Sequence, residues 1–370
     1  MMAKGIKEVC PEAAVHILPI ADGGEGTVDA VLATRQGEKL ERVVEDPLGR
    51  PVKAAIAWFP KLQTAVIEMA QASGMVHLSP AELDPHVAST YGTGQLIKHA
   101  LDLGAKKLIV GLGGSATVDG GLGCLQALGL KCYDNTGKVL ERVGGRLDQV
   151  AQVDASGLDP RLHHVRLTIA SDVTNPLLGE EGAIYVFGPQ KGVKEKEIPR
   201  FEQGMQRYAK LIEKVTGKNW AEHPGSGAAG GLGFALLSFF KAEVRSGIEL
   251  ILEICRFKEY LPTCDLVVTG EGKLDHQSLY GKGPVGIARL AKAHGVPCIA
   301  LTGYIGEGIE TLKEEGLLLA LPIVDRPLSL EEAMASGAEL VYRASKRLME
   351  TILLTKNMLS RGGKDATNIC

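Results

Sequence analysis

The sequence lacks a large excess of charge of either sign. Its 41 lysine and arginine residues nearly balance 44 aspartate and glutamate residues, which leaves a formal net charge of −3 and a pI of about 6.3. A protein that binds the phosphates of nucleic acid usually presents a basic surface. We therefore expect no nucleic-acid partner.

The chain also lacks the patterns of membrane and secreted proteins. No apolar run approaches the roughly 20 residues that a helix needs to cross a bilayer, and no signal peptide opens the sequence. Its seven cysteines include no Cys-x-x-Cys pair, and most lie in apolar segments, as reduced core cysteines do. We expect a cytoplasmic protein with no membrane partner.

Several signatures of catalysis are missing as well. No Gly-x4-Gly-Lys-Ser/Thr pattern occurs, which excludes a P-loop NTPase, and no Gly-x-Ser-x-Gly elbow of a serine hydrolase occurs. The nine histidines show no metal-ligand spacing. What the chain has in abundance is glycine, with 46 residues, many of them in short clusters beside acids.

Length and pattern predict two α/β domains, because 370 residues exceed one ordinary core. Strands and helices alternate after Asp265, ending in a long helix that opens with a capping box at Ser329 and Glu332. We expect residues 1–40 and 262–370 to form one discontinuous domain. Its sheet should be a doubly wound, Rossmann-like parallel sheet that includes a strand at 15–20. Residues 40–69 predict antiparallel strands. We expect 41–261 to form an inserted, smaller mixed α/β domain, with the active-site cleft between the two domains.

The glycine-rich stretch 111–123 follows an apolar run, 108–110, that is typical of a buried parallel strand. It precedes an expected helix, and the amide groups of a glycine turn before a helix suit an anion. Asp119 within the stretch would repel that anion unless a cation lay between them. The combination favours metal-assisted phosphate chemistry.

Four glycine loops of this kind carry acids or amides. They are Asp22-Gly-Gly-Glu25, Gly113-Gly114-Ser115 with Asp119, Asp172 with Asn175, and the 270–275 loop with Glu271 and Asp275. Each alone could be a tight turn whose acid caps the next helix, but four together predict a site. Lys191 and Lys282 lie in glycine-flanked loops and would neutralise phosphate charge, although either could equally be a solvated surface lysine.

Two other functions stay open on this reasoning. Gly111-x-Gly113-x-x-Ala116, with Asp134 near the usual acidic position, also fits a dinucleotide-binding turn, which would make the protein an oxidoreductase. A passive anion-binding module is the third option. The acids in the loops argue against it, because they do not help to hold an anion without a metal or a proton transfer.

Seven motifs occur in an order that resembles the bacterial glycerate kinases of type I from end to end. They lie at 21–27, 68–74, 113–121, 171–177, 187–192, 227–231 and 269–278. Members of that family begin with a strand and a Pro-Asp-Ser-Phe-Lys-type loop, whose Asp and Lys belong to the site. This chain starts after that loop, so we expect that its start was placed too late.

The resemblance implies ATP- and Mg²⁺-dependent phosphorylation of D-glycerate, with 2-phosphoglycerate as the favoured product and a homodimer as one allowed assembly. We predict in-line phosphoryl transfer, with Asp172 as the base or orienter of the hydroxyl and Asp275 as the second candidate. Four acids are the expected Mg²⁺ ligands: Asp22, Glu25, Asp119 and Glu271. The expected substrate and nucleotide contacts are Gly23, Gly24, Ser73, Gly113, Gly114, Ser115, Thr117, Asn175, Lys191, Gln277, Ser278 and Lys282.

Overall fold

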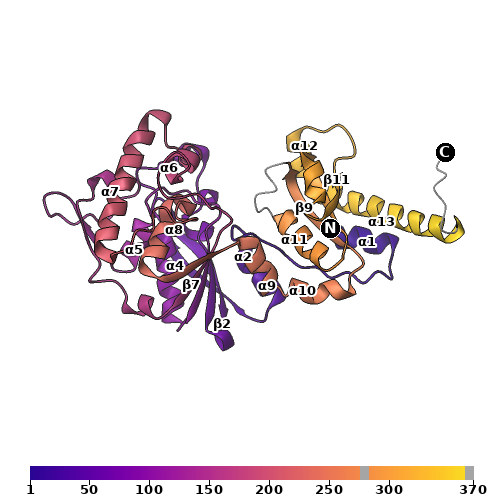
Figure 1. The fold of residues 1–370 in the computed structure, drawn as a ribbon, viewed down its shortest axis with the longest axis horizontal. Helices are drawn as coiled ribbons and strands as arrows, with labels where there is room; N and C mark the ends of the chain where they lie inside the picture. The colour runs from indigo at the N-terminus through magenta and orange to yellow at the C-terminus, as the bar shows by residue number, and fades with distance from the viewer. Residues whose placement is uncertain (276–282, 363–370) are drawn as a thin grey trace. The chain divides into compact units, whose positions relative to one another are not determined.

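A computed structural model describes residues 1–275 and 283–362 (Figure 1). The chain divides into two compact units, one made of Met1–Leu18 with Arg256–Cys370 and the other of Pro19–Cys255. Each unit has its own sheet. This division groups residues 19–40 with the inserted segment, and the domain limits of 1–40, 41–261 and 262–370 stay a prediction.

The larger unit, 19–255, is built on a six-stranded mixed sheet. In spatial order its strands are β1 (Glu38–Glu45), β2 (Pro51–Phe59), β3 (Thr64–Glu68), β4 (Lys107–Gly111), β7 (Arg166–Ala170) and β8 (Lys241–Arg245). β1, β2 and β3 are antiparallel neighbours, which confirms the strands expected within 40–69. β3, β4, β7 and β8 run parallel, so their carboxyl ends lie at one edge of the sheet.

Helices cover both faces of this sheet because successive residues of each strand point to opposite sides. Val66 of β3 packs in one core with α2 (Thr27–Thr34) and α9 (Gly247–Ile254), which contact each other (Figure 1). Its neighbour Ile67 packs in a second core with α4 (Tyr91–Asp102) and α8 (Ala228–Phe239). The α/β class predicted from the sequence is confirmed.

A further layer of the larger unit forms around α7 (Ile198–Thr216). Its apolar side packs with α5 (Leu122–Ala127) and α6 (Ala183–Phe187) in a separate core. β5 (Lys131–Tyr133) and β6 (Gln152–Asp154) pair in a small antiparallel sheet beside it. The four-residue helix α3 (Ala70–Ser73) follows β3 directly.

The smaller unit holds a three-stranded parallel sheet. Its order is β11 (Leu317–Pro322), β10 (Cys298–Ile305) and β9 (Val267–Leu274), and α11 (Gly283–Ala293) connects β9 to β10. α13 (Gly337–Gly362) packs on the sheet through Ala344 and Leu348 and contacts α1 (Met2–Val9). α10 (Phe257–Tyr260) and α12 (Leu330–Ala335) complete the helices of this unit that are described. The purely parallel sheet is thus the smaller of the two main sheets.

Three local expectations need correction. Residues 15–20 form no strand, because no described strand pairs with them, and Ile17 is 72% exposed. The expected alternation of strands and helices after Asp265 fails between β10 and β11, where Ile309–Lys313 form a 3₁₀ turn. The capping box at Ser329 and Glu332 is confirmed, but it opens the six-residue α12, and α13 is a separate helix that starts at Gly337.

Two compositional expectations can also be compared with the structure. Five cysteines of the described part are buried, Cys264 is half-buried, and all six are free thiols, which confirms their assignment as reduced cysteines. Within 1–275 and 283–362, no helix is long and apolar enough to span a bilayer.

Candidate active site

Four loops meet at the carboxyl edge of the parallel strands in the larger unit. β3, β4, β7 and β8 end at Glu68, Gly111, Ala170 and Arg245, and the loops that follow begin at the same edge. In open α/β sheets, ligands gather at this edge. The sequence placed Gly113, Asp172 and their neighbours there, and the structure brings them together.

The 22–27 loop lies directly on this edge with main chain against main chain. The Gly113 amide donates to the carbonyl oxygen of Gly23 at 3.3 Å. A Cβ atom on Gly111 would overlap that same oxygen, and one on Gly247 would overlap the carbonyl oxygen of Asp22. Because only glycine allows so close an approach, the three loops pack without side chains between them.

Two carboxylates from different loops face the same region. Oδ1 of Asp172 accepts hydrogen bonds from Oγ of Ser246 at 2.7 Å and from the amide of Gly247 at 3.0 Å. Burial raises the pKa of Asp172, the hydrogen bonds oppose the shift, and the negative charge of Asp22 adds to it. Oδ1 of Asp22 accepts from the Gly24 amide at 3.1 Å, so both acids are fixed in orientation.

Glu25 and the 113–115 segment add to this pair. A Cβ atom on Gly114 would lie 3.7 Å from Oε1 of Glu25, so this carboxylate adjoins the glycine loop after β4. Gly114 has a φ of +75°, in the left-handed region that glycine favours. Asp22 also adjoins this segment, because a Cβ atom on Gly24 would lie 3.2 Å from its Oδ1 and 3.7 Å from Cα of Gly113, and Asp172 lies near enough to Asp22 to be affected by its charge.

Lys191 supports this segment from the inside of the unit. It ends the 3₁₀ turn Pro189–Lys191 and is only 2% exposed. Its Nζ donates to Oγ of Ser115 at 2.6 Å and to the carbonyl oxygen of Thr117 at 2.9 Å. Burial lowers the pKa of Lys191 to about 7, against the opposing effect of the Asp119 charge. Lys191 thus holds the glycine loop, and it is not a solvated surface lysine.

Asp119 has a different surrounding from the one the sequence suggested. It is fully buried, and it accepts hydrogen bonds from the amide and Oγ1 of Thr90, both at 2.8 Å. The amides of Gly121 and Gly123 also donate to it, at 3.1 and 3.2 Å. These donors occupy the carboxylate, which argues against a role as a metal ligand and for one as an internal anchor.

Of three residues that were predicted to contact the substrate or the nucleotide, two form side-chain hydrogen bonds within the protein, and one is buried without a hydrogen-bond partner. Oγ of Ser73 pairs with Oγ1 of Thr93 at 2.8 Å, and Nδ2 of Asn175 donates to the carbonyl oxygen of Glu181 at 2.8 Å. Oγ1 of Thr117 is buried and has no hydrogen-bond partner. Ser73 and Thr117 are therefore structural neighbours of the loop cluster more than exposed contacts.

The remaining predicted residues lie in the smaller unit or outside the described part. Asp275 forms an ion pair with Lys273 at 2.8 Å, and Oε1 of Glu271 accepts from the amide of Gly272 at 3.2 Å. Gln277, Ser278 and Lys282 lie outside the described residues. Within the described ranges, no group of three or more His, Cys, Asp or Glu side chains is arranged to hold a metal ion.

Sequence reasoning missed Glu68. This last residue of β3 is 2% exposed, and its carboxylate accepts from the amides of Gly26 and Val28 and from Nε2 of Gln71. Burial raises the pKa of Glu68, and these hydrogen bonds oppose the shift. An acid that directly follows the apolar run 65–67, inside one of the seven motifs, is the signal that could have revealed it.

The start of α8 braces the loop after β4. Ala229, Gly230 and Gly231 have φ values of 52°, 63° and 92°, so three consecutive residues are left-handed. The carbonyl oxygen of Gly230 accepts from the amide of Gly120 at 3.0 Å. A Cβ atom on Gly230 would overlap the carbonyl oxygen of Thr117, so the two segments touch through their main chains.

The dinucleotide-binding alternative is not supported. A turn of that kind leads directly into a helix, but α5 begins only at Leu122, after the ten residues 112–121, which belong to no named helix or strand. The expected second strand is β5, which pairs with β6 and not with the parallel sheet. Asp134 lies in an exposed turn, where its Oδ1 accepts from Thr136 and Lys138.

Comparison with known proteins gives a consistent result. Residues 1–353 match the model of the Glycerate kinase family. The chain is similar to a glycerate kinase of Halalkalibacterium halodurans, with 45% identity over 93% of this chain and 91% of the relative. It is also similar to glycerate 2-kinase of Escherichia coli, with 42% identity over 95% and 92% of the two chains.

A solved structure agrees in fold. The crystal structure assigned to glycerate kinase 2 of Salmonella typhimurium superposes with a TM-score of 0.81 at 39% identity. The match covers 96% of this chain and 93% of the other.

Proposed function

Because this chain belongs to the glycerate kinase family, we propose that it transfers the γ-phosphoryl group of ATP in line to a hydroxyl group of D-glycerate. It is an enzyme, a kinase of glycerate, with a small organic acid as its substrate. Transfer to the 2-hydroxyl, giving 2-phosphoglycerate, is supported by the similarity to a relative named glycerate 2-kinase.

The observation that carries this proposal is the loop cluster at the carboxyl edge of the larger unit's sheet. Asp22 and Asp172 come from different loops, yet the charge of Asp22 raises the pKa of Asp172. The glycine segment 113–115 lies beside Glu25. Acids next to a glycine-rich segment fit a reaction in which a hydroxyl group and a polyphosphate must both be held.

Asp172 is the proposed base or orienter of the glycerate hydroxyl. Oγ of Ser246 and the Gly247 amide fix its Oδ1, so the carboxylate keeps one orientation. Its raised pKa makes it a better proton acceptor than a solvated aspartate. Asp275 of the smaller unit stays the second candidate for this role.

The residues present fit Mg²⁺, which proteins often bind through one or two carboxylates together with substrate phosphates. When bound, Mg²⁺ would neutralise charge on the phosphate oxygens. Asp22 and Glu25 are the proposed ligands from the larger unit, and Glu271 is retained as a candidate from the smaller one. Asp119 is left out of the set, because Thr90, Gly121 and Gly123 already donate to its oxygens.

The glycine segments would bind anionic groups through their main chain. Gly23, Gly24, Gly113 and Gly114 are the proposed residues of these segments, and Gly23 and Gly113 pack so closely on other parts of the cluster that neither has room for a Cβ atom. Lys191 acts on this surface through Ser115, because its Nζ is bonded to Oγ of that residue. Asn175, Gln277, Ser278 and Lys282 are retained as proposed contacts to substrate or nucleotide.

The test is a coupled assay of ADP release with D-glycerate, ATP and Mg²⁺, run beside a control without glycerate. We expect ADP release that depends on D-glycerate, and phosphorus NMR of the product should give the signal of a phosphate ester on the 2-oxygen. ADP release no higher than in the control would contradict the proposal. A 3-phosphate ester would contradict only the proposed position.

A further inference from the structure

Glu68 connects the central sheet to the acidic 22–27 loop. Its Oε2 accepts from the Gly26 amide at 3.3 Å, and its Oε1 accepts from the Val28 amide. Gly26 is the residue that precedes α2, and no side chain of its own caps that helix end. The acceptor for the Gly26 and Val28 amides therefore lies 42 and 40 residues further along the chain.

We propose that Glu68 is a positioning residue, which ties the 22–27 loop to the end of β3 so that Asp22 and Glu25 face the loops after β4 and β7. The inference rests on the proposed function, because it concerns the same site. It adds a residue that makes its contribution through the main chain of the loop and not through a ligand.

The loop packs closely on Gly111 and Gly247, but few hydrogen bonds join it to other segments of the unit. Gly23 and Gly26 have φ values of 94° and 85°, which gives the loop little stiffness of its own. Its main-chain bond from Gly113 to Gly23 is 3.3 Å long. An ionised acceptor at a helix N-terminus forms stronger hydrogen bonds than a neutral one, so Glu68 adds a charge-assisted restraint to the main-chain packing of the loop.

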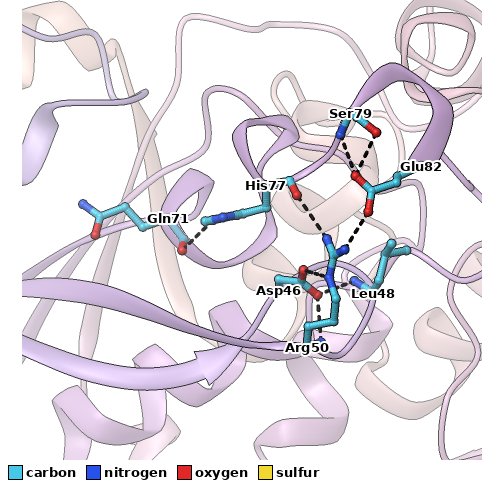
Figure 2. A network of polar contacts seen from close by, with 7 residues as sticks. All are labelled: Asp46, Leu48, Arg50, Gln71, His77, Ser79 and Glu82. Atoms are coloured by element: carbon cyan, nitrogen blue, oxygen red, sulfur yellow. Dashed lines mark hydrogen bonds and ion pairs between the residues drawn. The ribbon is translucent and has the colours of Figure 1, made fainter.

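A chain of polar contacts orients the Glu68 carboxylate in turn. Nε2 of Gln71 donates to Oε2 of Glu68 at 2.9 Å, and Oε1 of Gln71 accepts from the Ala55 amide at 2.7 Å. The carbonyl oxygen of Gln71 pairs with Nε2 of His77 at 2.8 Å. Figure 2 shows this contact and the bond from Arg50 to the carbonyl oxygen of His77, so the turn between β1 and β2 meets the main chain of this segment and bonds neither to Glu68 nor to the side chain of Gln71.

Asp46 offers a matched control in the same unit. Its carboxylate is 5% exposed, and Oδ1 accepts from the amides of Leu48 and Arg50 at 2.8 and 2.9 Å, while Oδ2 accepts from the Arg50 side chain (Figure 2). Two main-chain amides and one side-chain donor thus meet a buried acid, as at Glu68. Asp46, however, holds the turn after β1 and not the 22–27 loop.

The first experiment is hydrogen exchange on the free protein with Glu68→Gln and Asp46→Asn. In Glu68→Gln we expect the Gly26 and Val28 amides to exchange about tenfold faster or more, since the two amides bond to different oxygens of Glu68, and glutamine is uncharged and replaces one of these oxygens with an NH2 donor. In Asp46→Asn those two amides should keep the wild-type rate, while the Leu48 and Arg50 amides exchange faster. Unchanged exchange at Gly26 and Val28 in Glu68→Gln would overturn the inference.

The second experiment separates positioning from plain stability. Glu68→Gln should raise the KM for at least one substrate by about fivefold or more, because the acids of the loop lose their alignment. Asp46→Asn should lower thermal stability and leave both KM values within about twofold of wild type. Lower stability in Glu68→Gln with both KM values unchanged would mean that Glu68 is only structural.

Gln71→Leu covers the case in which Glu68→Gln does not fold. This variant keeps Glu68 but removes one hydrogen-bond donor to its carboxylate. We therefore expect the exchange rates of the Gly26 and Val28 amides and the KM to rise by about twofold to threefold, which is less than in Glu68→Gln. Wild-type values for both would contradict the inference. If the wild-type protein releases no ADP, the proposed reaction fails, and the exchange experiment still decides whether Glu68 holds the loop.

Discussion

Asp172 is the residue on which the proposed reaction depends most directly. Asp172→Asn keeps the shape of the side chain and can still bond with Ser246, but it removes the proton acceptor. We expect kcat to fall by about two to four orders of magnitude, with the fold intact by circular dichroism. Asp134→Asn, in an exposed turn, is the control and should keep wild-type kcat. Near-normal turnover in Asp172→Asn would move the role to Asp275, which Asp275→Asn then tests.

The buried Lys191 side chain should make the free energy of unfolding depend on pH above pH 7. Its pKa is about 7 in the folded protein and near the ordinary value of 10.5 in the unfolded chain. The unfolded chain therefore binds one more proton between these values, so the free energy of unfolding should rise as pH increases from about 7 to 10.5, in total by about 3–5 kcal/mol. Below pH 7 the contribution of this group should be constant.

Lys191→Met tests that prediction, because methionine fills a similar volume without a titrating group. Urea unfolding of both proteins at several pH values gives the difference in free energy. We expect the difference to change steadily across this window as the wild type gains stability. A difference that does not vary with pH would show that Lys191 titrates normally.

At single residues, the sequence predicted best where a side chain directly follows a strand. Gly113 and Asp172 were expected in loops of one site, and the structure places both at one sheet edge because β4 and β7 are parallel neighbours. Asp22 reaches the same edge through a loop that follows no strand. Asp119 was predicted to be a metal ligand because the sequence does not show that Thr90 donates to it. Thr90 lies 29 residues earlier in the chain, so this contact leaves no local pattern. The burial of Lys191 likewise depends on the packing of a distant 3₁₀ turn against Ser115.

At the scale of elements, the left-handed start of α8 makes a prediction about two adjacent residues. Ala229→Gly removes a Cβ atom from a residue with φ of 52°, so it should raise the free energy of unfolding by about 0.5–1 kcal/mol. Gly230→Ala adds a Cβ atom that overlaps the carbonyl oxygen of Thr117, so it should lower that free energy by about 2–4 kcal/mol.

Urea unfolding of the two variants under one condition measures both effects. Opposite signs for neighbours in one turn would be hard to explain by a general loss of helix content. Equal destabilisation by both substitutions would contradict the conformation described for this segment.

Strands could be predicted from the sequence where the strands that pair with them lie close by in the chain. The strands β1 to β3 pair through short turns, so their apolar pattern was sufficient. Residues 15–20 carry the same kind of pattern, yet Ile17 is 72% exposed, because a strand also needs a neighbour to pair with. The second strand of the dinucleotide alternative failed for a related reason, since β5 pairs with β6 and not with β4.

For the whole molecule, two units with separate sheets predict two steps in unfolding. Differential scanning calorimetry should resolve two transitions, with the larger heat for 19–255, because heat of unfolding scales with the number of residues in a folded unit. One transition with equal calorimetric and van't Hoff enthalpies would show that the units unfold together. Division into two α/β parts was expected from chain length, whereas the assignment of 19–40 depends on contacts of α2 with β2, β3 and α9.

The packing of main chain on main chain at Gly111, Gly113 and Gly247 has a consequence for how this protein can evolve. A clash between two side chains can be relieved when a second mutation makes the partner smaller. Here the partner atoms are carbonyl and Cα atoms of Asp22, Gly23 and Gly24, which no substitution can shrink. We therefore expect these three glycines to have no second-site suppressors, so that a library selected for activity would recover them unchanged in every genetic background.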